Sequence, residues 1–275
     1  MKKKIMAMCL VIAMAATAVI GGTLAYFTDT DEAVNVMTMG NVAIEQNEYQ
    51  RNEKGDELVK FVDDKPLMPA VYTNEEFAKT ADFVIDNEDN IADKNFTLRN
   101  EIGNIIDKVV TVKNTADANA INQDVYARTL FAFETKTSYN PDGTVHTEAK
   151  KVFNDYIATF GLGDSRFLTM DTILVNGVEY VVAEYVYENA LKPQEESAPS
   201  LKQLFLAPTA NNEVMNLFGK EYNVLVLSQA TQTAGFDNAV EALDTAFGDV
   251  ETATNPETGN LLVQEWFAAL NPANN

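Results

Sequence analysis

Histidine and cysteine, the residues that most often bind zinc or act as nucleophiles, are almost absent from this chain. Among its 275 residues there are one histidine, His146, and one cysteine, Cys9. A hydrolytic zinc site usually takes three protein ligands, prominently imidazoles, and leaves one position for water. The stretch "TVHTEAK" around His146 lacks His-Glu-x-x-His spacing. We therefore predict no catalytic residue and no metal site, and interpret His146 as a solvated residue at a strand end near a turn.

The stretch "DNEDNIADKNFT" (86–97) is the best match to a calcium loop. Asp86, Glu88 and Asn90 have the spacing of the first three EF-hand ligands. However, Ile91 stands where that loop needs glycine, and Thr97 stands where it needs a bidentate glutamate. We interpret the stretch as a polar loop and predict no cofactor, while weak calcium binding stays open for so acidic a chain.

Two other features are given structural roles. Arg128 and Arg166 stand out because arginine is scarce, and either is a candidate for a buried ion pair with a carboxylate. The stretch "NPETG" (255–259) is similar to a sortase signal, but the following "NLLVQEWFAALNPANN" is short and carries no basic tail. We interpret 255–259 as a turn.

The charge balance excludes several classes of partner. Lys and Arg number 20 against 41 Asp and Glu, so the formal net charge is −21. No basic surface is available to neutralise phosphates, which excludes nucleic acid and argues against anionic lipid surfaces. Divalent cations and basic surfaces are the natural partners of such a field. With 46% hydrophobic residues the chain can build a core, and its length suits one large β-sandwich.

The first 25 residues, "MKKKIMAMCLVIAMAATAVIGGTLA", have the pattern of a signal peptide. Three lysines precede an uncharged run, and Thr23 and Ala25 have the −3 and −1 spacing of a cleavage site. We predict cleavage between Ala25 and Tyr26. The rival interpretation is an uncleaved anchor, because the run from Ile5 to Phe27 carries no charge and is long enough to span a bilayer.

Cleavage would leave an exported chain without disulfides. The leader contains three lysines, no acidic residue and Cys9, so the mature chain has 17 basic and 41 acidic residues, a formal charge of −24 and no cysteine. An extracellular protein of this kind depends on its packed core or on assembly with neighbours.

The dominant period of the mature chain is two, which predicts strands. In "DVYARTLFAFE" (124–134) alternate residues from Val125 to Phe133 share one face. "TILVNGVEYVVAEYVYE" (172–188) predicts a hairpin, because Asn176-Gly177 suits a two-residue turn with positive φ. "YNVLVLSQA" (222–230) is apolar on both faces, as expected of a covered central strand.

Helices are the minority. "DNAVEALDTAFG" (237–248) predicts a helix with Asp237 as N-cap, Val240, Leu243 and Phe247 on one side, and Gly248 as its end. Residues 148–161 and 261–270 are weaker helix candidates. Residues 140–144 predict a turn, and residues 189–200 predict a polar loop containing prolines.

Four stretches together resemble a known family of exported proteins. "GGTLAYFTDTDE" is similar to the junction cleaved by the SipW-type signal peptidase in the TasA/camelysin family of Gram-positive bacteria. The other three are "DKVVTVKNTADANAINQDVYARTLFAFE", "YVYENALKPQEESAPSLKQLFLAPT" and "VLVLSQATQTAGFDNAVEALDTAFG". The likeness extends over most of the mature chain, but only the N-terminal junction is specific.

The resemblance implies a mainly β fold, a jelly-roll-like antiparallel β-sandwich with a few short helices. We expect residues 1–25 to be a signal peptide and residues 26–275 a single sandwich domain with an N-terminal assembly strand at about 26–45. Fibre-forming members insert this strand into the next subunit, a mode that supplies backbone hydrogen bonds and covers an open sheet edge. The expected anchors are Tyr26, Phe27, Val34 and Val36.

We therefore predict a structural protein and not an enzyme. It is expected to be secreted, to lie in the biofilm matrix or on the cell surface, and to form fibres with copies of itself and contacts with other matrix components. Two alternatives remain open. One is a camelysin-like metalloprotease that cleaves casein, and the other is a monomeric accessory protein that anchors or caps matrix fibres.

Overall fold

The computed structural model describes most of the chain after residue 104 and parts of the segment before it. The described residues are 36–39, 42–52, 57–62, 69, 105–119, 123–161, 166–167, 172–218 and 222–270. The expected leader, its cleavage site at Ala25 and Tyr26, the anchors Phe27 and Val34, and the polar loop 86–97 lie outside these ranges.

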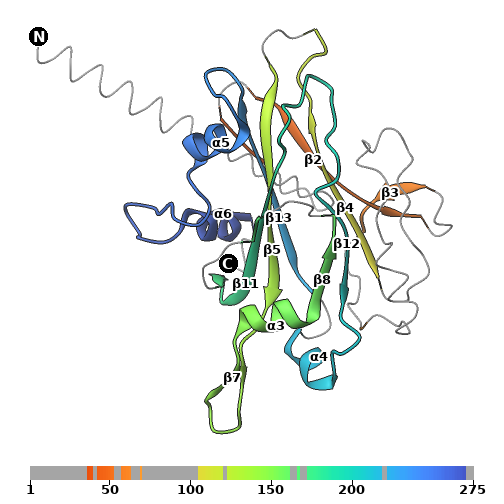
Figure 1. Ribbon diagram of the computed structural model, residues 1–275, viewed down its shortest axis with the longest axis vertical. Helices are drawn as coiled ribbons and strands as arrows, with labels where there is room; N and C mark the ends of the chain where they lie inside the picture. Colours follow the sequence, from red (N-terminus) through yellow and green to blue (C-terminus); the bar gives the residue numbers. More distant parts are fainter. Residues whose placement is uncertain are drawn as a thin grey trace, which may run out of the picture.

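Most of the regular structure is β-strand, gathered mainly into two large sheets (Figure 1). Sheet A has the order β1-β13-β5-β11-β10, with β9 paired beside β11. Its strands are β1 (Val36–Met39), β5 (Val125–Thr135), β9 (Arg166–Phe167), β10 (Ile173–Val175), β11 (Val178–Val186) and β13 (Val224–Gln232). Sheet B has the order β3-β2-β4-β12-β8. Its strands are β2 (Ile44–Arg51), β3 (Leu58–Lys60), β4 (Ile106–Asn114), β8 (Ile157–Phe160) and β12 (Leu201–Leu206).

The two sheets pack face to face around an apolar core. A large cluster between them joins Phe131 and Phe133 of β5 to Val110 of β4 and to Leu201 and Leu204 of β12. The two phenylalanine rings are stacked, with centroids 5.8 Å apart. A second cluster toward the other end joins residues of β2, β4, β5 and β13, namely Ile44, Val112, Val125, Ala127 and Ala230. This arrangement confirms the predicted mainly β sandwich.

The chain crosses between the sheets at most connections, in a jelly-roll-like manner. It passes from β4 in sheet B to β5 in sheet A, returns to sheet B at β8, and crosses again before β9, before β12 and before β13. The paired strands are antiparallel, with one exception among the described residues, because β1 runs parallel to β13. Strand β1 thereby forms one edge of sheet A, beside the last strand of the chain.

Sequence periodicity correctly predicts the central strands. The face of β5 that bears Phe131 and Phe133 packs into the core, as the alternation requires. Strand β13 lies between β1 and β5 and is buried along most of its length, as a strand apolar on both faces should be. The predicted hairpin joins β10 to β11, and its turn residues Asn176 and Gly177 have φ values of 50° and 83°.

Four short helices accompany the sheets in the part of the chain that is described, and two of them correct the sequence prediction. The helices are α3 (Ala149–Tyr156), α4 (Asn212–Phe218), α5 (Ala239–Phe247) and α6 (Leu262–Leu270). The helix expected over 148–161 ends at Tyr156, because the β-branched and aromatic run that follows becomes β8 and pairs with β12. Helix α6 matches its prediction closely.

The expected N-cap of α5 was wrong by one position, and Val240, one of the three residues expected on its apolar face, is exposed. Asn238, not Asp237, caps the helix, and its side-chain oxygen accepts a hydrogen bond from the Glu241 N–H at 2.9 Å. Val240 is 43% exposed, whereas Leu243 is fully buried. The reason is geometric, since successive helical residues turn by 100° and the buried face follows Ala239, Ala242, Leu243 and Phe247.

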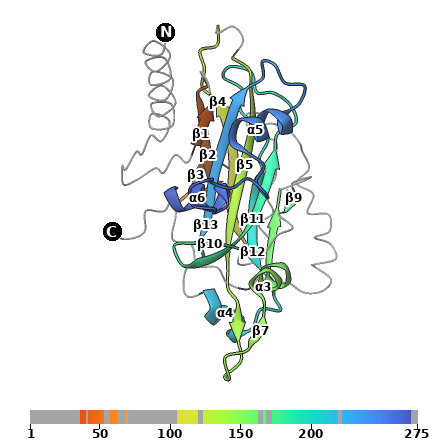
Figure 2. The same ribbon diagram turned by 90° about the vertical axis from the view of Figure 1, so that its left-hand side faces the viewer.

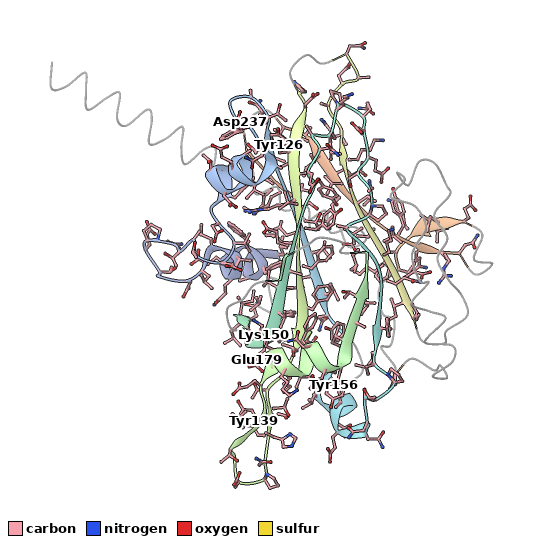
Figure 3. All side chains as sticks on the ribbon, viewed as in Figure 1. Tyr126, Tyr139, Lys150, Tyr156, Glu179 and Asp237 are labelled. Carbon is pink, nitrogen blue, oxygen red and sulfur yellow. The ribbon has the colours of Figure 1, made fainter. Side chains whose placement is uncertain are left out.

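Helices α5 and α6 cover the outer face of sheet A, so this sheet is buried on both sides (Figure 2). Leu130 of β5 and Leu227 of β13 pack with Phe267 of α6. Leu243 and Phe247 of α5 pack with Tyr126 of β5 and Val186 of β11. In Figure 3, Tyr126 accordingly lies beside Asp237, where the chain enters α5.

A layer of polar side chains separates the two apolar clusters inside the sandwich. The Ser228 hydroxyl donates to Oε1 of Gln46 at 2.8 Å and lies 3.3 Å from the Thr129 hydroxyl. Thr129 in turn lies 3.2 Å from the hydroxyl of Tyr187. Burial raises the pKa of the Tyr187 phenol. These groups satisfy one another in a region closed to water, so they fix how sheet B lies on sheet A.

Two loop predictions are confirmed. Residues 189–200 contain no helix or strand, and the backbone N–H of Ser197 donates to Val112 of β4 at 2.8 Å. Residues 140–144 turn between β6 (Ser138–Tyr139) and β7 (Val145–Thr147), which form a separate hairpin at the lower tip in Figure 1. Within the described residues, no helix is both long and apolar enough to cross a membrane.

Candidate functional site

The candidate site is the edge of sheet A, where β1 lies on β13. Val36 stands opposite Ser228 and Met37 opposite Gln229 in the parallel register. Because strand side chains alternate, these two residues enter different environments. Val36 packs toward the sandwich interior with the cluster that contains Ile44 and Ala230. Met37 packs on the opposite face, against the clusters beneath α5 and α6. Both side chains are half-buried.

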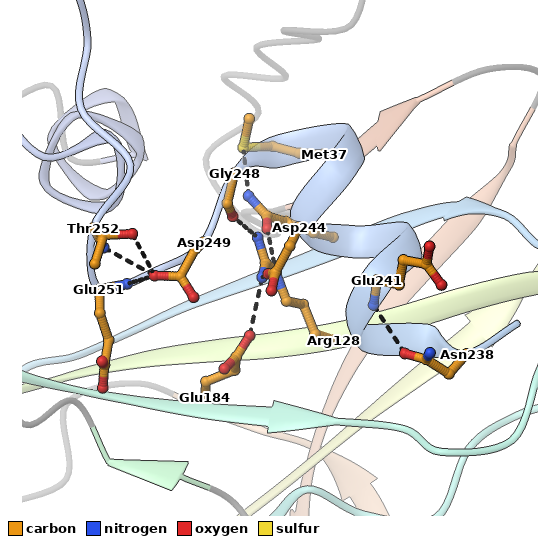
Figure 4. A network of polar contacts seen from close by, with 11 residues as sticks. Met37, Arg128, Glu184, Asn238, Glu241, Asp244, Gly248, Asp249, Glu251 and Thr252 are labelled. Carbon is orange, nitrogen blue, oxygen red and sulfur yellow. Dashed lines mark hydrogen bonds and ion pairs between the residues drawn. The ribbon is translucent and has the colours of Figure 1, made fainter. Parts of the chain in front are cut away.

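Beneath this edge lies a buried arginine network centred on β5 (Figure 4). The Arg128 side chain has no exposed surface. Its guanidinium spans from β5 to the neighbouring strands β11 and β13 and to α5. It donates from Nη1 to Glu184 at 3.0 Å and to Asp244 at 2.9 Å, from Nη2 to the Gly248 carbonyl at 3.0 Å, and from Nε to Gln229 Oε1 at 2.7 Å.

The buried positive charge of Arg128 is neutralised by nearby carboxylates. Glu184 is fully buried like Arg128, whereas the Asp244 side chain is 26% exposed. Removing an isolated cation from water is costly, and several charge-assisted hydrogen bonds are needed to offset that cost. The ring centroids of Trp266 and Phe247 lie 5.9 Å and 6.0 Å from the guanidinium carbon, within the range of cation–π contacts. Arg128 therefore joins sheet A to its helical cover.

The network continues to the edge strand through Gln229. Arginine can only donate hydrogen bonds, so the atom facing Arg128 must be the carboxamide oxygen of Gln229. The amide nitrogen of Gln229 then points the other way and lies 3.6 Å from the sulfur of Met37. A side chain of the N-terminal strand thus contacts a chain of polar groups that begins at Glu184.

Helix α5 supplies two of the arginine's acceptors because its end is sharply defined. Asp244 lies in the last turns of the helix, and Gly248 follows its final residue with φ of 98°. A Cβ atom on Gly248 would lie 2.6 Å from the Cβ of Ala253, so both its conformation and its surroundings require glycine. This sharp turn directs the Gly248 carbonyl toward Arg128.

No known relative identifies the site. No family model matches the chain, and neither a curated protein nor a solved structure matches it.

The structure places the other candidate residues apart from this edge. His146 lies exposed on β7, and its Nδ1 is 3.0 Å from the Thr147 hydroxyl and 3.4 Å from the Ser138 hydroxyl. It is the middle residue of this three-residue strand, exposed and close to the turn at 140–144, as predicted. Among the described ranges, no three His, Cys, Asp or Glu side chains come together as a metal-binding group. Arg166 lies in β9, which pairs with β11.

The sequence predictions covered part of the site. Val36 was expected in the assembly strand and lies in β1, while the prediction of a buried carboxylate partner is confirmed for Arg128. Met37, Gln229, Glu184 and Asp244 were not predicted as parts of one site. Gln229 carried a readable signal, since a carboxamide just after the apolar run 224–227 of a covered strand must find buried partners.

Proposed function

We propose that this protein is a secreted structural component of an extracellular or biofilm matrix, and that it forms fibres by exchanging its N-terminal strand between copies. The observation that supports this most directly is the position of β1. It is a four-residue strand at the edge of sheet A, and it pairs with β13 at the far end of the chain. The proposed export signal precedes it, so cleavage between Ala25 and Tyr26 would free the segment that leads into it.

Strand exchange conserves the contacts of the edge. If β1 of one copy takes the place of β1 on the β13 of another, Val36 and Met37 meet the same partners as before. Only the connection between β1 and β2 must open. Exchange of identical elements is therefore a low-cost route to assembly, and a head-to-tail exchange that does not close into a ring yields a fibre.

The direct test uses disulfide trapping in the mature chain 26–275, which contains no cysteine of its own. Thr38 lies opposite Ala230 in the β1–β13 register. Single variants Thr38→Cys and Ala230→Cys are mixed in equal amounts, incubated under assembly conditions and oxidised. Exchange predicts a covalent dimer linked through residues 38 and 230, identified by peptide mass spectrometry, together with fibres by negative-stain electron microscopy.

A matched control replaces the acceptor position. Leu174 lies on β10 at the opposite edge of sheet A and is 51% exposed. Mixing Thr38→Cys with Leu174→Cys should give no specific dimer, and a strong 38–174 link would indicate edge-to-edge addition in place of exchange. If the mature protein stays monomeric in every condition and links 38 to 230 only within one doubly substituted chain, the fibre proposal is wrong and the accessory protein takes its place.

A further inference from the structure

We propose that Gln229, held by Arg128, selects the register of the strand that lies on β13, and that Met37 is the residue that it selects. This inference deepens the proposed function by naming what specifies the strand. It can nevertheless be tested in a monomer, where β1 lies on its own chain.

The first step is that the position and orientation of Gln229 are fixed. Its carboxamide oxygen is bound by Arg128 Nε at 2.7 Å, and Arg128 is itself held by Glu184, Asp244 and the Gly248 carbonyl. The Gln229 side chain is fully buried. Rotating its amide would turn the NH₂ group toward a guanidinium that cannot accept a hydrogen bond. The Nε2 donor therefore always faces the edge strand and requires an acceptor there.

The second step is that alternation alone cannot set the register of this strand. The sequence "VNVMTM" (34–39) alternates smaller β-branched residues with longer ones. A slide by one residue would exchange the two faces, whereas a slide by two residues would preserve them. The alternative registers therefore place either Asn35 or Met39 opposite Gln229 in place of Met37.

The third step is that each slide loses one of two favourable contacts. Placing Met39 opposite Gln229 keeps a thioether acceptor, but it puts Thr38 where Val36 packs with Ile44 and Ala230. Placing Asn35 there keeps a valine inside, but it puts a carboxamide with two donors into an apolar cluster. That cluster contains Leu243, Phe247 and Trp266. Only the observed register combines an apolar inner residue with a soft, weak acceptor in an apolar surrounding.

The test measures register by disulfide scanning. In the mature chain, Thr38→Cys is combined in turn with Ala230→Cys, which reports the observed register, with Ser228→Cys, which reports Met39 opposite Gln229, and with Gln232→Cys, which reports Asn35 opposite Gln229. Each pair is oxidised slowly at protein concentrations that keep the chain monomeric. The ratio of shifted to observed links is measured by peptide mass spectrometry.

Two near-isosteric variants then remove the selecting contact. Met37→Leu keeps the apolar bulk without the acceptor, and Gln229→Glu keeps the oxygen bound by Arg128 but loses the Nε2 donor. Met37→Leu is expected to raise the ratio of shifted to observed links by roughly three- to ten-fold, the population equivalent of one neutral hydrogen bond. Gln229→Glu removes the donor from the observed register and from the Met39 register alike, so it is expected to raise only the link to residue 232, where the Asn35 amide can donate to the new carboxylate. Met39→Leu, the same substitution two residues along β1, removes the acceptor of the shifted register only, so it should lower the link to residue 228 and leave the link to residue 232 unchanged.

The inference is overturned if Met37→Leu leaves the ratio as it was, or if Met39→Leu raises it equally. Circular dichroism and a thermal melt verify that each variant is folded. Should the added carboxylate of Gln229→Glu prevent folding, Met37→Leu decides the question alone. Failure of fibre formation in the mixing experiment would leave this intramolecular result intact, so the two proposals fail separately.

Discussion

Among single residues, Arg128 carries its charge where water cannot reach, and its partner Glu184 is buried as completely. Removing the guanidinium would take away the cation that lies 3.0 Å from the fully buried Glu184 carboxylate. Arg128→Met keeps much of the side-chain volume, so the main loss is electrostatic. We expect the free energy of unfolding to fall by about 3–5 kcal/mol, measured by chemical denaturation.

Two further variants separate this explanation from a simple packing defect. Replacing both partners, in Arg128→Met with Glu184→Met, should recover part of the lost stability, because no buried carboxylate then lacks its cation. Lys151→Ala removes an exposed ion pair with Asp155 and should leave stability unchanged. A double variant less stable than Arg128→Met alone would contradict the electrostatic account.

The buried Tyr180 makes the free energy of unfolding depend on pH in the alkaline range. Burial, followed by the negative charge of Glu134, raises the pKa of Tyr180 to about 12, from an ordinary value of 10. The folded state therefore keeps this proton while the unfolded chain loses it, so stability is constant below about pH 10 and falls between about pH 10 and 12. Tyr180→Phe should reduce that fall in denaturation curves recorded across this range.

The matched control is Tyr139→Phe, because Tyr139 is 63% exposed on the β6–β7 hairpin (Figure 3). It should leave the alkaline midpoint of unfolding unchanged. An equal effect of both substitutions would show that burial of Tyr180 is not the cause.

At the scale of elements, β1 contributes less to the core than any central strand of sheet A. The large apolar cluster between the sheets is formed without it, whereas Val36 and Met37 are half-buried at the margins of other clusters. Deleting residues 26–39 should therefore leave a cooperatively folding monomer with a lower melting temperature, and it should abolish fibres. Calorimetry and sedimentation velocity measure the two effects.

The truncated chain can be tested further by adding back the missing strand as a separate peptide. Adding a synthetic peptide of residues 26–39 should raise the melting temperature of the truncated chain, because the β13 edge is again covered. If the truncated chain is instead unfolded, β1 is an integral part of its own core and exchange is not its role.

Periodicity could predict the strands but not their distant neighbours. The alternation in β5 and the Asn176-Gly177 turn are local signals, because each depends on residues within one strand or one hairpin. The parallel pairing of β1 with β13 and the convergence of Glu184, Gln229 and Asp244 on Arg128 depend on how sheets and helices pack. Helix α5 shows the limit of local reading, since packing against sheet A buries Ala239 and Ala242 with Leu243 and leaves Val240 exposed.

At the scale of the whole molecule, net charge opposes assembly. Mature subunits of formal charge −24 repel one another, and salt weakens this repulsion over a Debye length of about 10 Å at 0.1 M. We expect assembly to be slow at low ionic strength, faster with added sodium chloride, and faster still with calcium at equal ionic strength. Light scattering follows the rate, and electron microscopy identifies the product.

Magnesium at the same ionic strength distinguishes screening from binding. Equal acceleration of assembly by both divalent ions would indicate general neutralisation of carboxylates. Acceleration by calcium alone would indicate a specific calcium site, for which the acidic segment 86–97 is the candidate. Assembly that is fastest without salt would contradict the view that charge repulsion limits the rate.

The pairing of β1 with β13, the first and last of the described strands, also has a consequence in time. Met37 and Gln229 are 192 residues apart in the chain. At a synthesis rate of about 5–20 residues per second, β13 follows β1 by roughly 10–40 seconds. During that interval the earliest strand has no partner of its own, and closing so long a loop is a slow, late event. The chain's own β1 and the β1 of a neighbour can therefore compete for β13 only after β13 has been synthesised to its last residue, Gln232.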